Sequence, residues 1–124
     1  KSSMANRILI IEDNPSLIKA IKAKFDGIKY QVSYAMDGEE GIELFDSIKP
    51  DLVLLDIAMP KKNGLEVLEY IRSEANSEVP VIIFSNFKEP DKVDAAEKLG
   101  IECYILKADT SLAKLVSNVN KILS

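Results

Sequence analysis

The chain has 124 residues, 47% of them hydrophobic and 29% charged, and a formal net charge of −4. This length predicts one domain with its own core, and the acidic balance argues against direct nucleic-acid binding, which usually uses a basic surface. No apolar run approaches the roughly 18 to 20 residues that cross a bilayer. We therefore expect a protein that does not enter the membrane and whose partners are other proteins.

The start of the chain and its single cysteine predict a cytoplasmic setting. Only four apolar residues follow Arg7, far fewer than the ~7 to 15 of a secretory signal, and Cys103 has no second cysteine for an internal disulfide. Residues 1–3 precede Met4 and are interpreted as a cloning remnant, so the domain is expected over residues 4–124. The chain contains no histidine, so any phosphorylated imidazole must come from another molecule.

Short apolar runs alternate with amphipathic segments along the whole chain. The runs predicted as strands are Arg7–Ile11, Tyr30–Tyr34, Leu52–Leu55, Val81–Phe84 and Cys103–Leu106. They are nearly continuous rather than alternating with polar residues. This pattern is typical of parallel strands covered on both faces.

The first amphipathic segment shows why helices are expected between the runs. Leu17, Ile21 and Phe25 recur at the spacing that places side chains on one helix face. Asn14 is suited to cap this helix, and Pro15 to occupy its first position.

Later segments carry similar signals. Residues 37–40 resemble a capping box, and Gly27 and Gly100 follow expected helix ends. The last helix has the clearest apolar stripe, made of Leu112, Leu115, Val116, Val119, Ile122 and Leu123. The order of elements is (βα)5, and right-handed crossovers then predict an α/β, doubly wound, five-stranded parallel sheet.

Polar residues follow four of the five predicted strands, at the sheet edge where ligands bind in such folds. Glu12 and Asp13 follow the first strand, Asp56 the third, Ser85 and Asn86 the fourth, and Lys107 the fifth. Three carboxylates brought together would raise one another's pKa values unless a cation joined them. Oxygen ligands without histidine or cysteine favour Mg²⁺ or Mn²⁺. With the metal bound, one carboxylate can act as a nucleophile while the ion, Lys107 and Ser85 hold a phosphoryl group.

Each of these residues taken alone also has an ordinary structural interpretation. Asp13 can cap a helix, although Asn14 fills that role better, and Asp56 can begin a turn. Ser85 alone is more often a hydrogen-bonded hydroxyl, and Lys107 alone a solvated charge. The convergence of complementary groups on one edge favours the functional interpretation.

These residues carry a resemblance to a known family. The chain from Arg7 to Ser124 resembles the CheY-like receiver domain of two-component response regulators. The resemblance implies a flavodoxin-like sheet with strand order 2-1-3-4-5. The matching positions are Glu12, Asp13, Asp56, Met59, Pro60, Gly64, Ser85, Tyr104 and Lys107.

The resemblance implies that Asp56 accepts a phosphoryl group from a phosphohistidine on a histidine kinase or histidine phosphotransfer protein. It further implies that Asp13, Asp56 and the backbone carbonyl of Ala58 ligate Mg²⁺, while Glu12 acts through the metal's waters. Pro60 and Gly64 are expected to shape the loop that supplies the carbonyl.

The resemblance also assigns a switch. Lys107 would pair with the phosphoryl group, Ser85 would turn its hydroxyl toward it, and Tyr104 would move inward. The face built from the fourth helix, fifth strand and fifth helix would then control a downstream protein target or output domain. The chain would be a signalling switch, as a monomer or a phosphorylation-dependent dimer, and not an enzyme with its own substrate.

Three positions depart from the family's commonest pattern. Glu12 stands where Asp is frequent, which is a familiar variant. Asn86 stands where a small residue is usual, which leaves the width of the phosphoryl pocket open. Ala108 stands where proline is usual, which leaves the geometry of the peptide after Lys107 open. The rim of the pocket, formed by Ala58, Asn86 and Phe87, is expected to set the lifetime of the aspartyl phosphate.

Other classes fit the sequence less well. A haloacid-dehalogenase-like phosphatase has a second Asp where this chain has Ala58, and nucleotide-binding α/β domains need a glycine-rich turn that residues 11–17 lack. A pseudo-receiver that serves only for docking would not need the intact Asp13, Asp56, Ser85 and Lys107. Whether the domain is free-standing or cut from a longer protein stays open.

Overall fold

The computed structural model describes residues 6–25, 30–59 and 63–124. Its five strands are β1 (Asn6–Ile11), β2 (Tyr30–Ala35), β3 (Leu52–Leu55), β4 (Val81–Ser85) and β5 (Cys103–Leu106). Its helices are α1 (Pro15–Phe25), α2 (Gly38–Ile48), α3 (Gly64–Glu69), α4 (Pro90–Leu99) and α5 (Leu112–Leu123), with a π-helical turn η1 (Tyr70–Glu74) after α3 and a 3-10 turn η2 (Lys107–Asp109) after β5.

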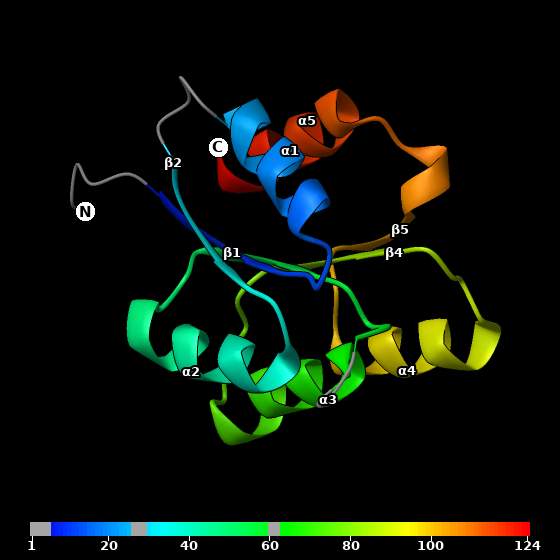
Figure 1. Cartoon of the computed structure of the whole chain (residues 1–124). Helices are drawn as coiled ribbons and strands as arrows, with labels where there is room; N and C mark the ends of the chain where they lie inside the picture. Colours follow the sequence, from blue (N-terminus) through cyan, green and yellow to red (C-terminus); the bar gives the residue numbers. More distant parts are fainter. Residues whose placement is uncertain (1–5, 26–29, 60–62) are drawn as a thin grey trace.

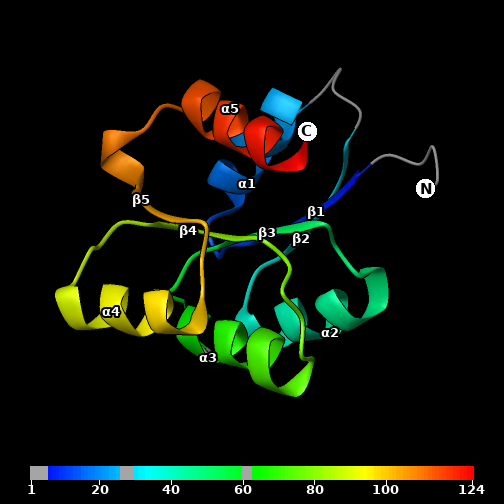
Figure 2. The ribbon, with the colours of Figure 1, turned by 180° about the vertical axis from the view of Figure 1, so that it is seen from behind.

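The strands form one sheet in the order β2-β1-β3-β4-β5, and every pairing is parallel. Helices α1 and α5 cover one face of the sheet, and α2, α3 and α4 cover the other (Figure 1). The view from behind shows the same three layers (Figure 2). The predicted (βα)5 fold and its strand order are confirmed.

Each face of the sheet has its own apolar core because successive side chains of a strand point to opposite faces. In β1, Ile8 and Ile10 pack toward α1 and α5, whereas Leu9 and Ile11 pack toward α2 and α3. All four are at most 1% exposed. This explains why the central strands β1, β3 and β4 carry polar residues only at their ends.

The prediction that every strand is covered on both faces is wrong for β2. Its residues Gln31 and Tyr34 are exposed and Val32 and Ser33 only half-buried, because β2 lies at the edge of the sheet and pairs with β1 alone. The central strands β3 and β4 are buried throughout.

Local signals place most helix ends where they were expected. The backbone N–H of Leu17 donates to Asn14 Oδ1 at 3.2 Å, which confirms Asn14 as the cap of α1. At α2 the N–H of Glu40 donates to Asp37 Oδ1, but the Glu40 carboxylate accepts from the N–H of Met36 rather than from Asp37. Gly100 ends α4 with φ 100°, a conformation that favours glycine. The predicted end at Gly27 lies outside the described residues.

Asp56 and Ile57, the residues directly after β3, pack closely against Gly64. A Cβ added at Gly64 would lie 2.4 Å from the backbone oxygen of Asp56 and 2.4 Å from the Cα of Ile57. The Gly64 N–H donates to the Ile57 carbonyl at 3.2 Å. Asn63 and Glu66 form a capping box at the same helix start, which the sequence analysis did not predict. Pro60, assigned to the same loop, lies outside the described residues.

No helix in the described ranges is long and apolar enough to cross a bilayer.

We predict that Gly64→Ala lowers the free energy of unfolding by roughly 1 to 3 kcal/mol, because the new methyl group meets backbone that cannot move without shifting Asp56. Chemical denaturation measures the change. Gly41→Ala is the matched control, since its methyl group meets only the Ile11 side chain, at 2.8 Å. An equal loss in both variants, or none at Gly64, would contradict this account of the loop.

Candidate phosphoryl and metal site

The carboxyl ends of β1 and β3 bring three acidic side chains together. Each of Glu12, Asp13 and Asp56 offers an oxygen, and these oxygens all lie within 4.8 Å of one another. Glu12 is 3% and Asp56 4% exposed, while Asp13 is exposed. The predicted carboxylate cluster is therefore present, and its donor set is one that could hold a metal ion.

Backbone bonds fix the buried carboxylates in place. Neighbouring strands hold the main chain: the N–H of Asp56 donates to the Ile11 carbonyl at 3.0 Å, and the N–H of Glu12 to the Ala35 carbonyl at 2.9 Å. The Ala58 N–H donates to Asp56 Oδ1 at 3.0 Å. This bond fixes the orientation of the Asp56 carboxylate beside the exposed Ala58.

Lys107 joins the two buried carboxylates. Its Nζ lies 2.9 Å from Glu12 Oε1 and 3.1 Å from Asp56 Oδ2. Lys107 begins η2 rather than ending β5, and its side chain is 14% exposed. Nζ also lies 6.0 Å from the centroid of the Phe84 ring. The Lys107 ammonium therefore offsets part of the negative charge of the carboxylates, which the sequence analysis expected a metal ion to do.

Burial and charge act in opposite directions on these groups. Burial raises the pKa of Glu12, and the Asp56 charge adds to this, whereas the hydrogen bond and charge of Lys107 oppose it. Burial by itself would lower the pKa of Lys107, but the hydrogen bond to Glu12 and the charge of Asp56 outweigh it and raise that pKa. The ammonium is therefore held in its charged form between the two carboxylates.

Ser85 and Tyr104 lie beside this cluster, and the hydroxyl of each forms a hydrogen bond with the Phe87 backbone. Ser85 is fully buried at the end of β4, and its Oγ accepts from the Phe87 N–H at 3.3 Å. The half-buried Tyr104 donates its O–H to the Phe87 carbonyl at 2.7 Å. Burial raises the pKa of Tyr104, while a hydrogen bond with Ser85 opposes the rise. Both side chains thus connect the site to the segment between β4 and α4.

The rim residues are open to solvent. Ala58 and Asn86 are exposed, and Phe87 exposes 59% of its surface. The described part of the chain contains no cis peptide bond, so the bond from Lys107 to Ala108 is trans.

Comparison with known proteins identifies the family. Residues 8–120 match the family model described as the response regulator receiver domain. The chain belongs to this family. It is 41% identical over 113 residues to the transcriptional regulatory protein DltR of Streptococcus agalactiae, a match that covers 88% of this chain and 50% of DltR. The chain therefore spans half the length of this curated relative.

Solved structures agree with this assignment. The N-terminal domain of an uncharacterised protein from Wolinella succinogenes (WS1339) is 31% identical, with a TM-score of 0.87 over 95% of this chain and 94% of that one. The Vibrio cholerae chemotaxis protein CheY4 is 20% identical, with a TM-score of 0.85 over 97% of this chain and 99% of that one, which shows the shared fold. The predicted resemblance to CheY-like receiver domains is confirmed, and the domain is a signalling module of the response-regulator type.

The sequence analysis missed one feature of this receiver domain. It gave Lys107 the phosphoryl group as its partner, but the lysine already pairs with Glu12 and Asp56. Residue type and position predicted that Lys107 would reach the site, but not that its ammonium would pair with these two carboxylates.

We predict that, in the absence of metal, Lys107→Ala lowers the free energy of unfolding by roughly 3 to 5 kcal/mol, because Glu12 then stays buried without its cation. Mg²⁺ binding should be at least as tight as in the parent protein, since a positive charge next to two carboxylates is removed. Denaturation and Mg²⁺ titration measure the two effects, with the exposed Lys121→Ala as control. Weaker Mg²⁺ binding in a folded Lys107→Ala would show that the lysine positions the carboxylates for the metal.

Proposed function

We propose that this receiver domain accepts a phosphoryl group on Asp56 in an Mg²⁺-dependent reaction, from a phosphohistidine of a histidine kinase or histidine phosphotransfer protein. The observation that carries the proposal is the group of three carboxylate oxygens within 4.8 Å, with Lys107 already 3.1 Å from Asp56. These 124 residues include no histidine, so the phosphohistidine would lie outside this domain. The bound ion would screen the charge of the incoming phosphoryl group.

The residues have separate roles in this proposal. Asp56 Oδ2 would attack phosphorus, and the bond from phosphorus to the donor nitrogen would break, leaving the donor imidazole to take a proton. Asp13, Asp56 and the Ala58 carbonyl would ligate the ion, with Glu12 contributing through its waters. Lys107 would transfer its ion pair from the Asp56 oxygen to the phosphoryl group, because the phosphorylated carboxylate no longer carries that charge.

We expect the switch to run through Ser85 and Tyr104. The Ser85 hydroxyl would leave the Phe87 N–H and donate to the phosphoryl group, and Tyr104 would then move inward from its bond to the Phe87 carbonyl. This would change the face formed by α4, β5 and α5, through which a downstream target or output domain would respond. Ala58, Asn86 and Phe87, all exposed around the site, would control how water reaches the phosphoryl group and hence its lifetime.

We predict that a small phosphodonor with Mg²⁺ adds one phosphoryl group to the protein, and that Asp56→Asn abolishes the addition because the amide is not a nucleophile. Intact-mass spectrometry reads the product, and a chelator should prevent it. The exposed Asp109→Asn is the matched control and should label like the parent. Labelling of Asp56→Asn at the parent's rate would place the acceptor elsewhere.

We further predict that Tyr104→Phe leaves labelling at Asp56 intact but reduces the chemical-shift changes that phosphorylation causes in α4 and β5. The variant removes only the O–H that binds the Phe87 carbonyl. Two-dimensional NMR of the parent and variant, with and without phosphodonor, measures this. Tyr30→Phe is the control, because its O–H bonds Asn120 at 2.6 Å, in α5, away from the site. Unchanged shift differences in Tyr104→Phe would exclude the hydroxyl from the switch.

A further inference from the structure

A pocket of about 500 Å³ opens at the surface between α1 and the end of β2. Small-molecule sites in proteins usually measure about 300 to 1,000 Å³, whereas a protein partner usually contacts about 20 to 30 residues. The size of this pocket therefore favours a small molecule over a protein. Seven residues line it, namely Pro15, Ile18, Lys19, Lys22, Ala23, Tyr34 and Met36.

Most of the pocket lining is apolar, and part of it is aromatic. Ile18 is 4% exposed, so it lies at the bottom of the pocket. Tyr34 is 45% and Met36 36% exposed, two of the three large hydrophobic residues that are open to solvent in the described part of the chain. A ligand that covered them would remove apolar surface from water. Because a tyrosine ring and a methionine sulfur both form favourable contacts with aromatic rings, this surface favours an aromatic ligand.

Two ammonium groups border this apolar surface. Lys22 Nζ lies 4.9 Å from the centroid of the Tyr34 ring, and Lys19 is exposed on the same side of α1, three residues earlier. Within the described residues, neither ammonium forms a salt bridge or donates a hydrogen bond. None of the described residues that line the pocket is acidic. An anionic group of a ligand can therefore pair with both lysines without displacing a carboxylate.

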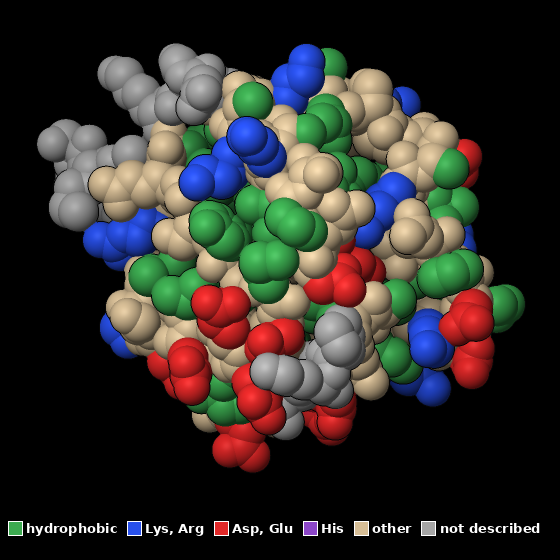
Figure 3. All heavy atoms as spheres, viewed as in Figure 1, with side chains coloured by type: hydrophobic (Ala, Val, Ile, Leu, Met, Phe, Trp, Pro, Cys, Tyr) green, Lys and Arg blue, Asp and Glu red, His purple; other side chains and the backbone are tan. Residues whose placement is uncertain are grey.

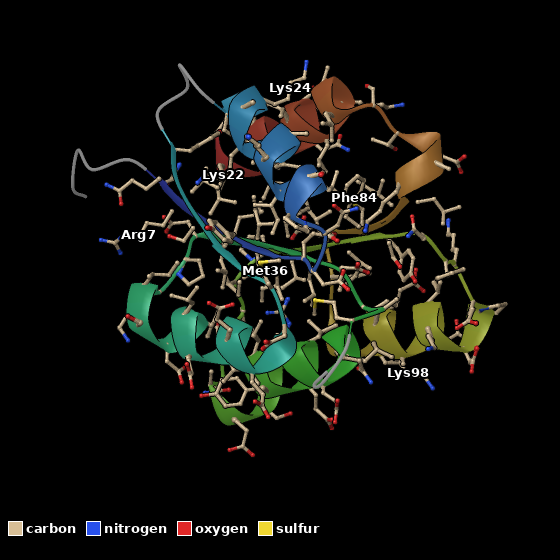
Figure 4. The ribbon with its side chains drawn as sticks, viewed as in Figure 1. Arg7, Lys22, Lys24, Met36, Phe84 and Lys98 are labelled. Atoms are coloured by element: carbon tan, nitrogen blue, oxygen red, sulfur yellow. The ribbon has the colours of Figure 1, made fainter. Side chains whose placement is uncertain are left out.

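The charges differ between the two ends of the pocket. The lysines lie on its α1 side, whereas beside Met36 the Glu40 carboxylate accepts a hydrogen bond from the Met36 N–H at 2.9 Å. The space-filling view shows an apolar patch on this face with basic side chains above it (Figure 3). In the side-chain view Lys22 lies above Met36, and Lys24 lies higher still on α1 (Figure 4). An anionic group is therefore attracted to the α1 side and repelled from the end at Met36.

We propose that this pocket binds a small aromatic carboxylate. The ring packs against Tyr34 and Met36, and the two carboxylate oxygens each accept a hydrogen bond from one of the ammonium groups of Lys19 and Lys22. None of the lining residues belongs to the phosphoryl and metal site, so the proposal is independent of the function proposed above.

The test is a titration of the full chain, labelled with ¹⁵N, with 2-naphthoate as the probe and two-dimensional NMR as the readout. The probe should bind with a Kd of about 1 mM or tighter, and the shift changes should centre on α1, Tyr34 and Met36. 2-Naphthamide keeps the rings but has no charge, and cyclohexanecarboxylate keeps the charge but has no aromatic ring. Each should bind at least about fivefold more weakly than 2-naphthoate.

Lys19→Gln/Lys22→Gln removes both positive charges and keeps most of each side chain. It should weaken 2-naphthoate at least about fivefold and leave 2-naphthamide unchanged, so that the two probes bind alike. Lys24→Gln/Lys114→Gln is the matched control, because it makes the same change in net charge at exposed lysines that do not line the pocket. It should bind 2-naphthoate like the parent.

The dispersion of the NMR spectrum shows that each variant is folded. Four results would each overturn the proposal: no binding of 2-naphthoate by the parent, shift changes centred on another surface, equal affinity for 2-naphthoate and 2-naphthamide in the parent, or a control variant that loses as much affinity as Lys19→Gln/Lys22→Gln.

Discussion

The buried ion pairs among Glu12, Asp56 and Lys107 are the interaction on which the rest of the site depends. Glu12 and Asp56 end or follow central strands, are almost fully buried, and would repel each other without a cation. The ammonium of Lys107 lies within 3.1 Å of both carboxylates. This receiver domain therefore keeps its buried acidic residues in place through the charge of one ammonium that contacts both carboxylates.

Helices cover both faces of the sheet and so fix the positions of these charged residues (Figure 1). The two separate apolar cores fix the register of the central strands, because a shift of one residue would turn each side chain into the other core, which is packed around different side chains. The strand ends then present Glu12, Asp56 and Ser85 at fixed positions. The backbone of Asp56 and Ile57, directly after β3, is held separately by its contact with Gly64.

A chain of hydrogen bonds connects the site to the segment between β4 and α4. From the buried Ser85, hydrogen bonds lead through the backbone of Phe87 to the Tyr104 hydroxyl. The edge strand β2 lies outside this route, at the opposite edge of the sheet from β5.

The sequence by itself determined the order of elements, the parallel sheet and the residues at its functional edge. Continuous apolar runs can be satisfied only by burial, and parallel strands place their carboxyl ends on one edge, so Glu12, Asp13, Asp56, Ser85 and Lys107 could be assigned to the site by position along the chain. Local caps such as Asn14 followed from nearest-neighbour chemistry.

Only the tertiary structure decided which side chains pair and how far each is buried. The bond from Lys107 to Glu12 joins the residues that directly follow β5 and β1, two strands that are not neighbours in the sheet, and no local pattern encodes it. The half-exposed β2 likewise follows from its place at the sheet edge, which strand order and not composition sets. Local patterns fix what a segment must bury, whereas distances between segments depend on the packing of the whole chain.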